Sequence, residues 1–115
     1  MILLKVDEAY AFDYLAILEV KNSKIKNNVT SSNLSEYSAA IEHQLGEKFH
    51  EVINSEEYNK LVKANEKSFN IIDLVRSGTN VTAQKVDDLN TDRFIIKKEL
   101  QKKFFNQEIT EQKNL

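Results

Sequence analysis

Four polar side chains that can hold an anion fall within the apolar stripes of this sequence. Asn65 and Arg76 belong to one expected helix. Asn90 and Arg93 belong to the next. A polar group on a core-facing position has to be paired, hydrated or used by a ligand, because burying it alone costs free energy. Arginine suits a carboxylate or a phosphate, since its planar guanidinium can donate two parallel hydrogen bonds.

Other charged side chains share these faces when the helices are projected at about 100° per residue. Lys97 continues the row of the last helix at the spacing i, i+3, i+7, and Lys21 lies between two isoleucines of the first helix. The cations outnumber the nearby carboxylates of Asp13 and Asp73. An unpaired buried guanidinium costs several kcal/mol, so a bound anion, water or a carboxylate of a second subunit is expected. The residues that we expect to bind a ligand are Lys21, Asn65, Asp73, Arg76, Asn90, Arg93 and Lys97.

The same residues also allow a purely structural interpretation. Lysine and arginine can extend from the flank of a helix to water while their stems stay buried. Asp73 and Arg76, at i and i+3, can form a local ion pair. An interface between subunits is a third interpretation. The two asparagines favour a specific role in each case, because an amide in an apolar stripe must satisfy both its donor and its acceptor.

Length and composition indicate one small soluble domain, residues 1–115. A chain of this length buries about two-thirds of its unfolded surface. Lys and Arg number 16 against 18 Asp and Glu, a net charge of −2, so no global field attracts nucleic acid or an anionic membrane. The absence of cysteine excludes disulfides and thiolate metal sites. With no apolar run long enough for a membrane span or signal peptide, we expect a cytoplasmic protein without membrane or nucleic-acid partners.

The lack of proline, the presence of only two glycines and helical apolar spacing predict an all-α fold. We expect an antiparallel bundle of about four helices after a short extended segment at residues 2–6. The helices should run from Asp7 to about Lys26, from about Leu34 to a break at Asn54 and Ser55, from there to Gly78, and from Thr82 to about Phe105. Residues 27–33 form the clearest loop, and the polar tail at 106–115 is expected to fray.

The break at Asn54 and Ser55 follows from a change of phase in the apolar pattern. The stripe that ends at Val52 and the stripe that begins at Tyr58 lie on faces rotated by about 120°. One straight helix cannot bury both against a single neighbour. Ser55 is also a favourable N-cap, with two glutamates following it in the first turn.

Weaker patterns have structural interpretations. His43 and His50 share a helical face without a matching ligand cluster, so we expect no metal site. The run KKELQKK at residues 97–103 resembles a basic patch, but Glu99 interrupts it and no aromatic residue is interleaved. A solvated helix face explains it better. Tyrosines 10, 14 and 37 are expected to pack in the core rather than act as acids.

Several blocks of the chain resemble a small uncharacterised helical protein family of bacteria and their phages, a domain of unknown function. The blocks are FDYLAILEVK (12–21), NEKSFNIIDLVR (65–76), LNTDRFIIKKEL (89–100) and EITEQK (108–113). The pattern of the family falls on Asp13, Glu19, Lys21, Asn65, Phe69, Asp73, Arg76, Asn90, Arg93 and Lys97. The resemblance implies a shared helical fold and polar centre, and it supplies no activity or cofactor.

This chain departs from the family pattern at three positions. Ile72 and Thr91 stand where the family tends to have an acid, and Phe69 stands where tryptophan is usual. A metal-binding or base role of those acids in relatives would therefore not carry over to this chain.

The function that we expect is the binding of a small anionic metabolite at the cation-rich centre of a homo-oligomeric helical protein, without a cofactor. The alternative is a non-catalytic structural or accessory protein that acts through self-association. A third class is a small enzyme, in which Arg93, Arg76 and Lys21 would clamp a carboxylate or phosphate. Asp73 would then move a proton. The absence of histidine and cysteine from the cluster leaves the enzyme little support.

Overall fold

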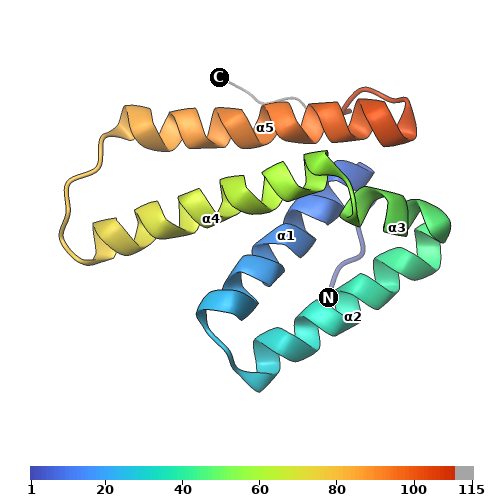
Figure 1. Ribbon diagram of the computed structural model, residues 1–115, viewed down its shortest axis with the longest axis horizontal. Coiled ribbons are helices and arrows are strands. Elements are labelled where there is room, and N and C mark those ends of the chain that lie inside the picture. Colours follow the sequence, from blue (N-terminus) through green and yellow to red (C-terminus); the bar gives the residue numbers. More distant parts are fainter. Residues whose placement is uncertain (111–115) are drawn as a thin grey trace.

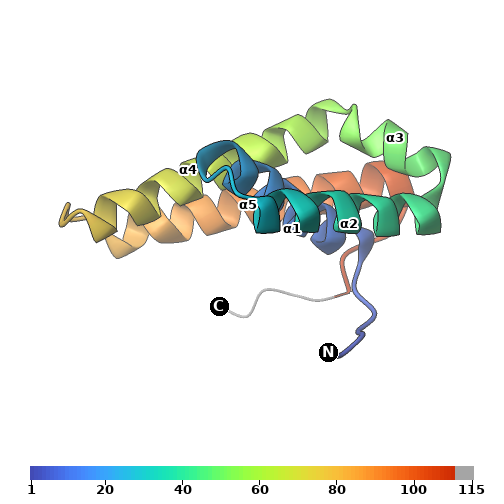
Figure 2. The same cartoon turned by 90° about the horizontal axis from the view of Figure 1, so that it is seen from below.

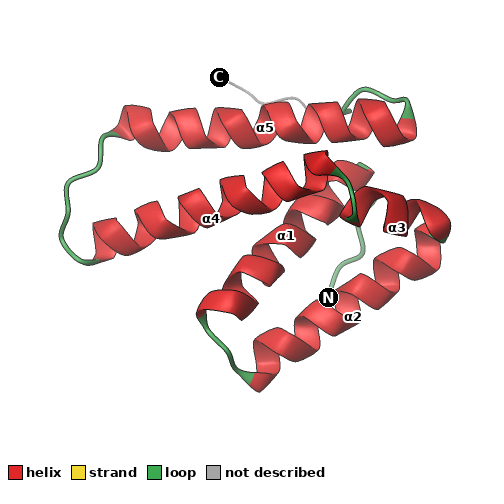
Figure 3. Cartoon of the chain, viewed as in Figure 1, coloured by secondary structure: helices red, strands yellow, loops and turns green. Residues whose placement is uncertain are grey.

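Five α-helices make up the computed structural model, which describes residues 1–110 (Figure 1). They are α1 (Glu8–Lys24), α2 (Asn28–Leu45), α3 (Glu47–Ile53), α4 (Glu56–Arg76) and α5 (Ala83–Phe105). The part of the chain that is described contains no strand (Figure 3). The all-α prediction is therefore confirmed, with one helix more than the four expected.

Local capping chemistry explains the boundaries that the sequence predicted. Ser55 precedes α4, and its Oγ accepts a hydrogen bond from the Tyr58 N–H at 3.1 Å. Thr82 precedes α5, and its Oγ1 accepts from the Lys85 N–H at 3.1 Å. Gly78 follows the end of α4 with φ of +91°, a conformation that only glycine adopts easily. The break before α4 and the turn between α4 and α5 are therefore confirmed.

Two expectations about α2 are wrong. The loop expected at residues 27–33 does not form, because Asn27 caps the helix and its Oδ1 accepts from the Thr30 N–H at 2.8 Å. The helix expected from Leu34 to the break at Asn54 is divided at Gly46, whose φ of 59° and ψ of −132° are not helical. This region of backbone space is open to glycine at little cost, so α2 ends there and the short α3 begins.

The core lies where α1 crosses α4 and α5. The long helices α4 and α5 run side by side in opposite directions (Figures 1 and 2). α2 packs on α1, and the short α3 connects α2 to α4. Phe12 is fully buried at the centre, with ring centroids 6.1 Å from Phe49, 6.1 Å from Tyr58 and 6.4 Å from Phe105. Aromatic residues from three helices, α3, α4 and α5, therefore pack around one ring of α1.

A buried side-chain amide accepts a hydrogen bond from the backbone at the start of α1. Gln101 of α5 is completely buried, and its Oε1 accepts a hydrogen bond from the Ala9 N–H at 2.9 Å. Its Nε2 donates to Glu8 Oε1 at 3.1 Å. The first N–H groups of a helix have no partner within the helix, so this side chain supplies one from a neighbouring helix. Sequence reasoning did not identify Gln101, which follows an apolar residue in a basic run.

The segment after α5 is held against the start of α1. Ile109 is buried, and Thr110 donates from both its N–H and its Oγ1 to Asp7 Oδ2, at 2.7 and 3.0 Å. The expectation that the tail frays is therefore wrong for residues 106–110, because an apolar side chain and a carboxylate fix it. Residues 111–115 lie outside the described part of the chain.

The end of the α4–α5 pair extends past the other helices (Figures 1 and 2). We call residues 69–90 the distal hairpin. Its exposed large apolar residues are Ile72, Leu74, Val75 and Val86. Because α1 does not reach this end, the apolar stripes of α4 and α5 face each other here without a third helix to cover them.

Candidate functional site

A buried carboxylate joins three helices. Asp13 of α1 is only 6% exposed. Its Oδ1 accepts a hydrogen bond from Asn65 Nδ2 at 2.8 Å, and its Oδ2 accepts from Arg93 Nη2 at 2.9 Å. Lys97 Nζ lies 3.5 Å from the same Oδ2. Asn65 Nδ2 also donates to the Leu61 carbonyl oxygen at 3.0 Å. Asp13, Asn65, Arg93 and Lys97 form what we call the Asp13 network.

The Asp13 network carries more positive than negative charge. Arg93 and Lys97 share the single carboxylate of Asp13, which leaves a net charge of about +1 at neutral pH. Their side chains are only 20% and 12% exposed, so water screens this charge poorly. The ammonium of Lys97 also lies 4.4 Å from the centroid of the Tyr10 ring, where the aromatic face attracts a cation.

A groove lies beside Arg93, between the distal parts of α4 and α5. Its volume is about 320 Å³. The residues that line it are Ser68, Ile71, Ile72, Val75, Arg76, Val86, Leu89, Asn90 and Arg93. We call it the Arg93 groove. It contains three of the residues that the sequence singled out, and it adds Ser68, which the sequence analysis missed.

Two buried polar atoms in the lining of the Arg93 groove have no partner among residues 1–110. They are Nε of Arg93 and Oγ of Ser68. A buried donor without a partner costs about 1–3 kcal/mol, and more when it is charged. Such atoms are rare in folded proteins and indicate a bound group or ordered water. Asp13 therefore holds one end of the guanidinium through Nη2, while Nε is left for another acceptor.

The structure brings most of the expected site residues together in two adjoining groups. Asn65, Arg93 and Lys97 meet at Asp13, and Arg76 and Asn90 join Arg93 in the groove. Arg93 belongs to both groups. The sequence indicated Asp13 only as a carboxylate near the cations, whereas the structure places it at the centre of the network.

Lys21 and Asp73 lie outside both groups, on exposed positions of α1 and α4. Arg76 and Asn90 are also exposed, although they line the groove. The expectation that Lys21, Arg76 and Asn90 face the core is therefore wrong, and Asp73, expected beside them, is exposed as well. Arg76 and Asn90 lie on the faces of α4 and α5 that line the groove, but these faces continue past the region that a neighbouring helix covers. The clamp of Arg93, Arg76 and Lys21 with Asp73 as proton carrier is not assembled.

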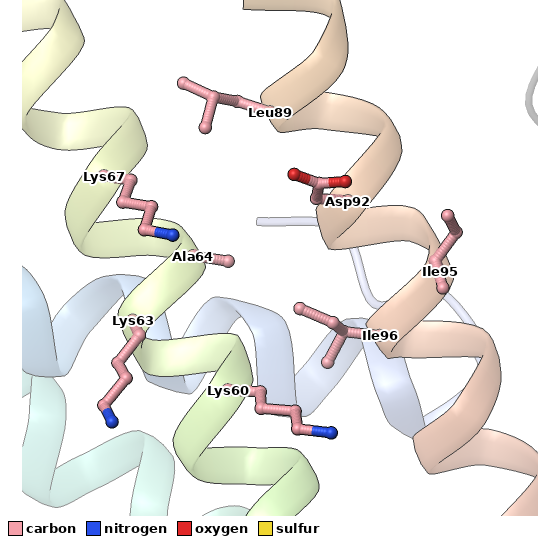
Figure 4. A pocket seen from close by; sticks show the side chains of 8 residues that line it. All are labelled: Lys60, Lys63, Ala64, Lys67, Leu89, Asp92, Ile95 and Ile96. Carbon is pink, nitrogen blue, oxygen red and sulfur yellow. The ribbon is translucent and has the colours of Figure 1, made fainter.

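A second hollow of about 320 Å³ lies along the same two helices (Figure 4). Its charged residues are Lys60, Lys63 and Lys67 of α4 and Asp92 of α5. Figure 4 shows Lys67 and Asp92 facing each other across it, while Lys63 points away. The three lysines are exposed, and this hollow contains none of the buried unpaired atoms found among the described residues. The Arg93 groove is therefore the stronger candidate for a ligand site.

Two other expectations can be compared with the described residues. His50 of α3 pairs with Glu42 of α2, and residues 1–110 contain no cluster of three or more side chains suited to a metal ion. Within the same range, no helix combines the length and the apolar character that crossing a bilayer requires. Comparisons of the chain with protein-family models, curated proteins and solved structures found no match. The resemblance to a family of bacteria and phages stays a prediction.

Tyr58 lies next to the Asp13 network, and its environment predicts that the stability of the fold declines at alkaline pH. Its hydroxyl donates to Glu19 Oε2 at 2.6 Å. Burial raises the pKa of Tyr58 well above its usual value, and the carboxylates of Glu19 and Asp13 raise it further. In the unfolded chain the phenol ionises near its ordinary pKa of about 10. The folded pKa is the higher one, so the stabilisation is complete below about pH 10 and declines above it, by up to about 1.4 kcal/mol per pH unit.

We therefore expect wild-type protein to lose stability between about pH 10 and about pH 11.5 more steeply than Tyr58→Phe does. Urea unfolding at a series of pH values measures this difference. Tyr14→Phe is the matched control, because Tyr14 is an exposed tyrosine of α1 and the variant should keep the wild-type slope. Parallel curves for wild type and Tyr58→Phe would contradict the expectation.

Proposed function

We propose that the protein binds a small anionic metabolite in the Arg93 groove. The observation that carries the proposal is the buried Nε of Arg93, which lacks a partner among the described residues and belongs to a side chain that lines the groove. An anion at this atom would satisfy the donor and compensate the positive charge of the Asp13 network. Asn90 and Arg76 line the same groove and can donate further hydrogen bonds.

The position of Arg93 supports this function. The ion pair with Asp13 holds the guanidinium in place before any ligand arrives, so binding costs less side-chain entropy. The pair also leaves the network positive, because Lys97 contacts the same carboxylate. Arg76 is exposed and makes no ion pair with the described residues, so it is free to meet an anion from solvent.

Thermal unfolding against a panel of phosphates, nucleotides, sugar phosphates, monocarboxylates and dicarboxylates tests the proposal. A ligand at a hundred times its Kd adds about 2.7 kcal/mol, which raises the Tm by several degrees. We expect at least one anion to stabilise wild type and to have no effect on Arg93→Lys. That variant keeps a cation for Asp13 but has no Nε.

Lys21→Met is the control for this experiment. It removes a cation that the structure places outside the groove, so it should respond to the anion as wild type does. The proposal fails if no anion in the panel shifts the wild-type Tm, or if Lys21→Met loses the response together with Arg93→Lys.

The exposed apolar residues of the distal hairpin favour a second candidate, a structural or accessory role through self-association. In this alternative, the hairpins of two copies pack together and complete an antiparallel four-helix bundle. The residues that would be covered are Ile72, Leu74, Val75 and Val86. The mass in solution, measured by light scattering, separates a homodimer from a monomer with an open groove.

A further inference from the structure

The lining of the Arg93 groove narrows the ligand to one chemical class. We propose that the ligand is a monocarboxylate with an aliphatic or aromatic body. This inference rests on the proposed function and deepens it. Three features support this class: the apolar walls, the two unpaired donors and the charge of the Asp13 network.

The walls of the groove are mainly apolar. The aliphatic residues in its lining are Ile71, Ile72, Val75, Val86 and Leu89. A phosphate or a dicarboxylate would give up strongly held water against such walls and gain no hydrogen bonds from them. An apolar body gains free energy when it covers the same surface. The volume of about 320 Å³ is near the lower end of the range for small-molecule sites, which suits a single compact body.

The unpaired polar atoms among the lining residues suit one carboxylate. Arg93 Nε and Ser68 Oγ are both buried and unpaired among the described residues, and they come from α5 and α4. A carboxylate has two oxygens, each of which can accept a hydrogen bond. A carboxylate therefore offers one acceptor for each of these donors. A neutral alcohol has only one oxygen and brings no charge to the guanidinium.

The charge of the site also matches a single negative charge. Asp13 already offsets one of the two cations that contact it, which leaves a net charge of about +1. A monoanion neutralises this excess. A dianion would need Arg76 as its second counter-charge, and Arg76 is exposed, so water and salt weaken its contribution.

Isothermal titration calorimetry with octanoate as the probe tests this ligand class. Octan-1-ol has the same chain without the charge, and acetate has the charge without the chain. Inorganic phosphate and succinate are the dianionic comparators. We expect octanoate to bind wild type with a Kd at least about tenfold lower than that of any comparator.

Two variants separate the apolar walls from the cation. Val75→Asp places a carboxylate in the lining and is expected to abolish octanoate binding. Val29→Asp makes the same change at an exposed valine of α2, outside the groove, and should leave the Kd unchanged. Arg93→Lys should weaken octanoate binding without abolishing it, because the variant keeps the positive charge but has no Nε to donate a hydrogen bond.

The outcomes distinguish this inference from the proposed function. Binding of phosphate or succinate that depends on Arg93, with no binding of octanoate, overturns the ligand class and leaves the proposed function standing. Equal binding of octan-1-ol and octanoate, unaffected by Arg93→Lys, overturns both. Octanoate binding that survives Val75→Asp shows that the probe lies elsewhere and overturns the inference. Absence of binding by every probe overturns the ligand class, and the thermal-unfolding panel then decides whether the proposed function stands.

Discussion

Asp13→Asn is expected to lower the free energy of unfolding by about 3 kcal/mol, although the two side chains are nearly the same size. The variant removes the carboxylate charge that Arg93 and Lys97 share, and both of these cations are largely buried. Breaking a buried ion pair from one side leaves an uncompensated charge in a poorly solvated position. Urea unfolding at neutral pH measures the change.

Asp73→Asn is the matched control for this variant. Asp73 was part of the expected site, but it is exposed and outside the network, so the change should alter stability by no more than about 0.5 kcal/mol. Adding Arg93→Met to Asp13→Asn should recover part of the loss, because it removes one of the stranded cations. Equal effects of Asp13→Asn and Asp73→Asn would mean that the Asp13 network does not stabilise the fold.

Phe12→Ala is expected to cost about 4 kcal/mol, a large part of the total stability of a small domain. Phe12 is fully buried and its ring packs among rings from α3, α4 and α5. Removing it opens a cavity at the crossing of four helices, which these helices cannot close without losing their other contacts. The midpoint of urea unfolding should fall while the slope stays constant.

The control for Phe12→Ala is Tyr14→Ala in the same helix. Tyr14 is 48% exposed and contacts Tyr37 edge-to-face, with the ring centroids 5.2 Å apart. Its removal should cost only about 1 kcal/mol. If the two variants were equally stable, the aromatic cluster around Phe12 would not be the centre of the core.

Helix ends that depend on local chemistry were predictable from the sequence. Ser55 and Thr82 cap the helices that follow them, and Gly78 ends α4, because a hydroxyl or a missing Cβ acts on the adjacent backbone alone. Gly46 acts in the same local way, but an apolar stripe continues across it and suggested one helix. Asn27 was assigned to a loop, since a polar stretch reads equally well as an exposed helix.

The burial of each residue depended on how far the neighbouring helix extends along its own helix. The spacing of apolar residues in the sequence does not contain this information. α4 and α5 have 21 and 23 residues, whereas α1 has 17 and crosses them near one end. Arg93 lies within the crossing and is largely buried, while Arg76 and Asn90 lie beyond it. The pattern of faces was therefore informative, but the extent of coverage could not be read from it.

Only part of the candidate site could be predicted from the sequence. Asn65, Arg93 and Lys97 were identified because an amide or a cation interrupts an apolar stripe. Ser68 was missed, since a serine in a helix usually bonds to its own backbone and attracts no attention. Gln101 was missed because its partners lie 92 and 93 residues away along the chain.

The uncovered distal hairpin implies that this fold does not open as a single unit. Backbone hydrogen bonds near the turn are protected by few buried side chains, so they should break in local fluctuations that leave the Phe12 cluster intact. Amide hydrogens of residues 72–88 would then exchange with solvent much faster than those of α1. A ligand in the Arg93 groove would slow this exchange selectively, because it would contact both helices of the hairpin as α1 does elsewhere in the fold.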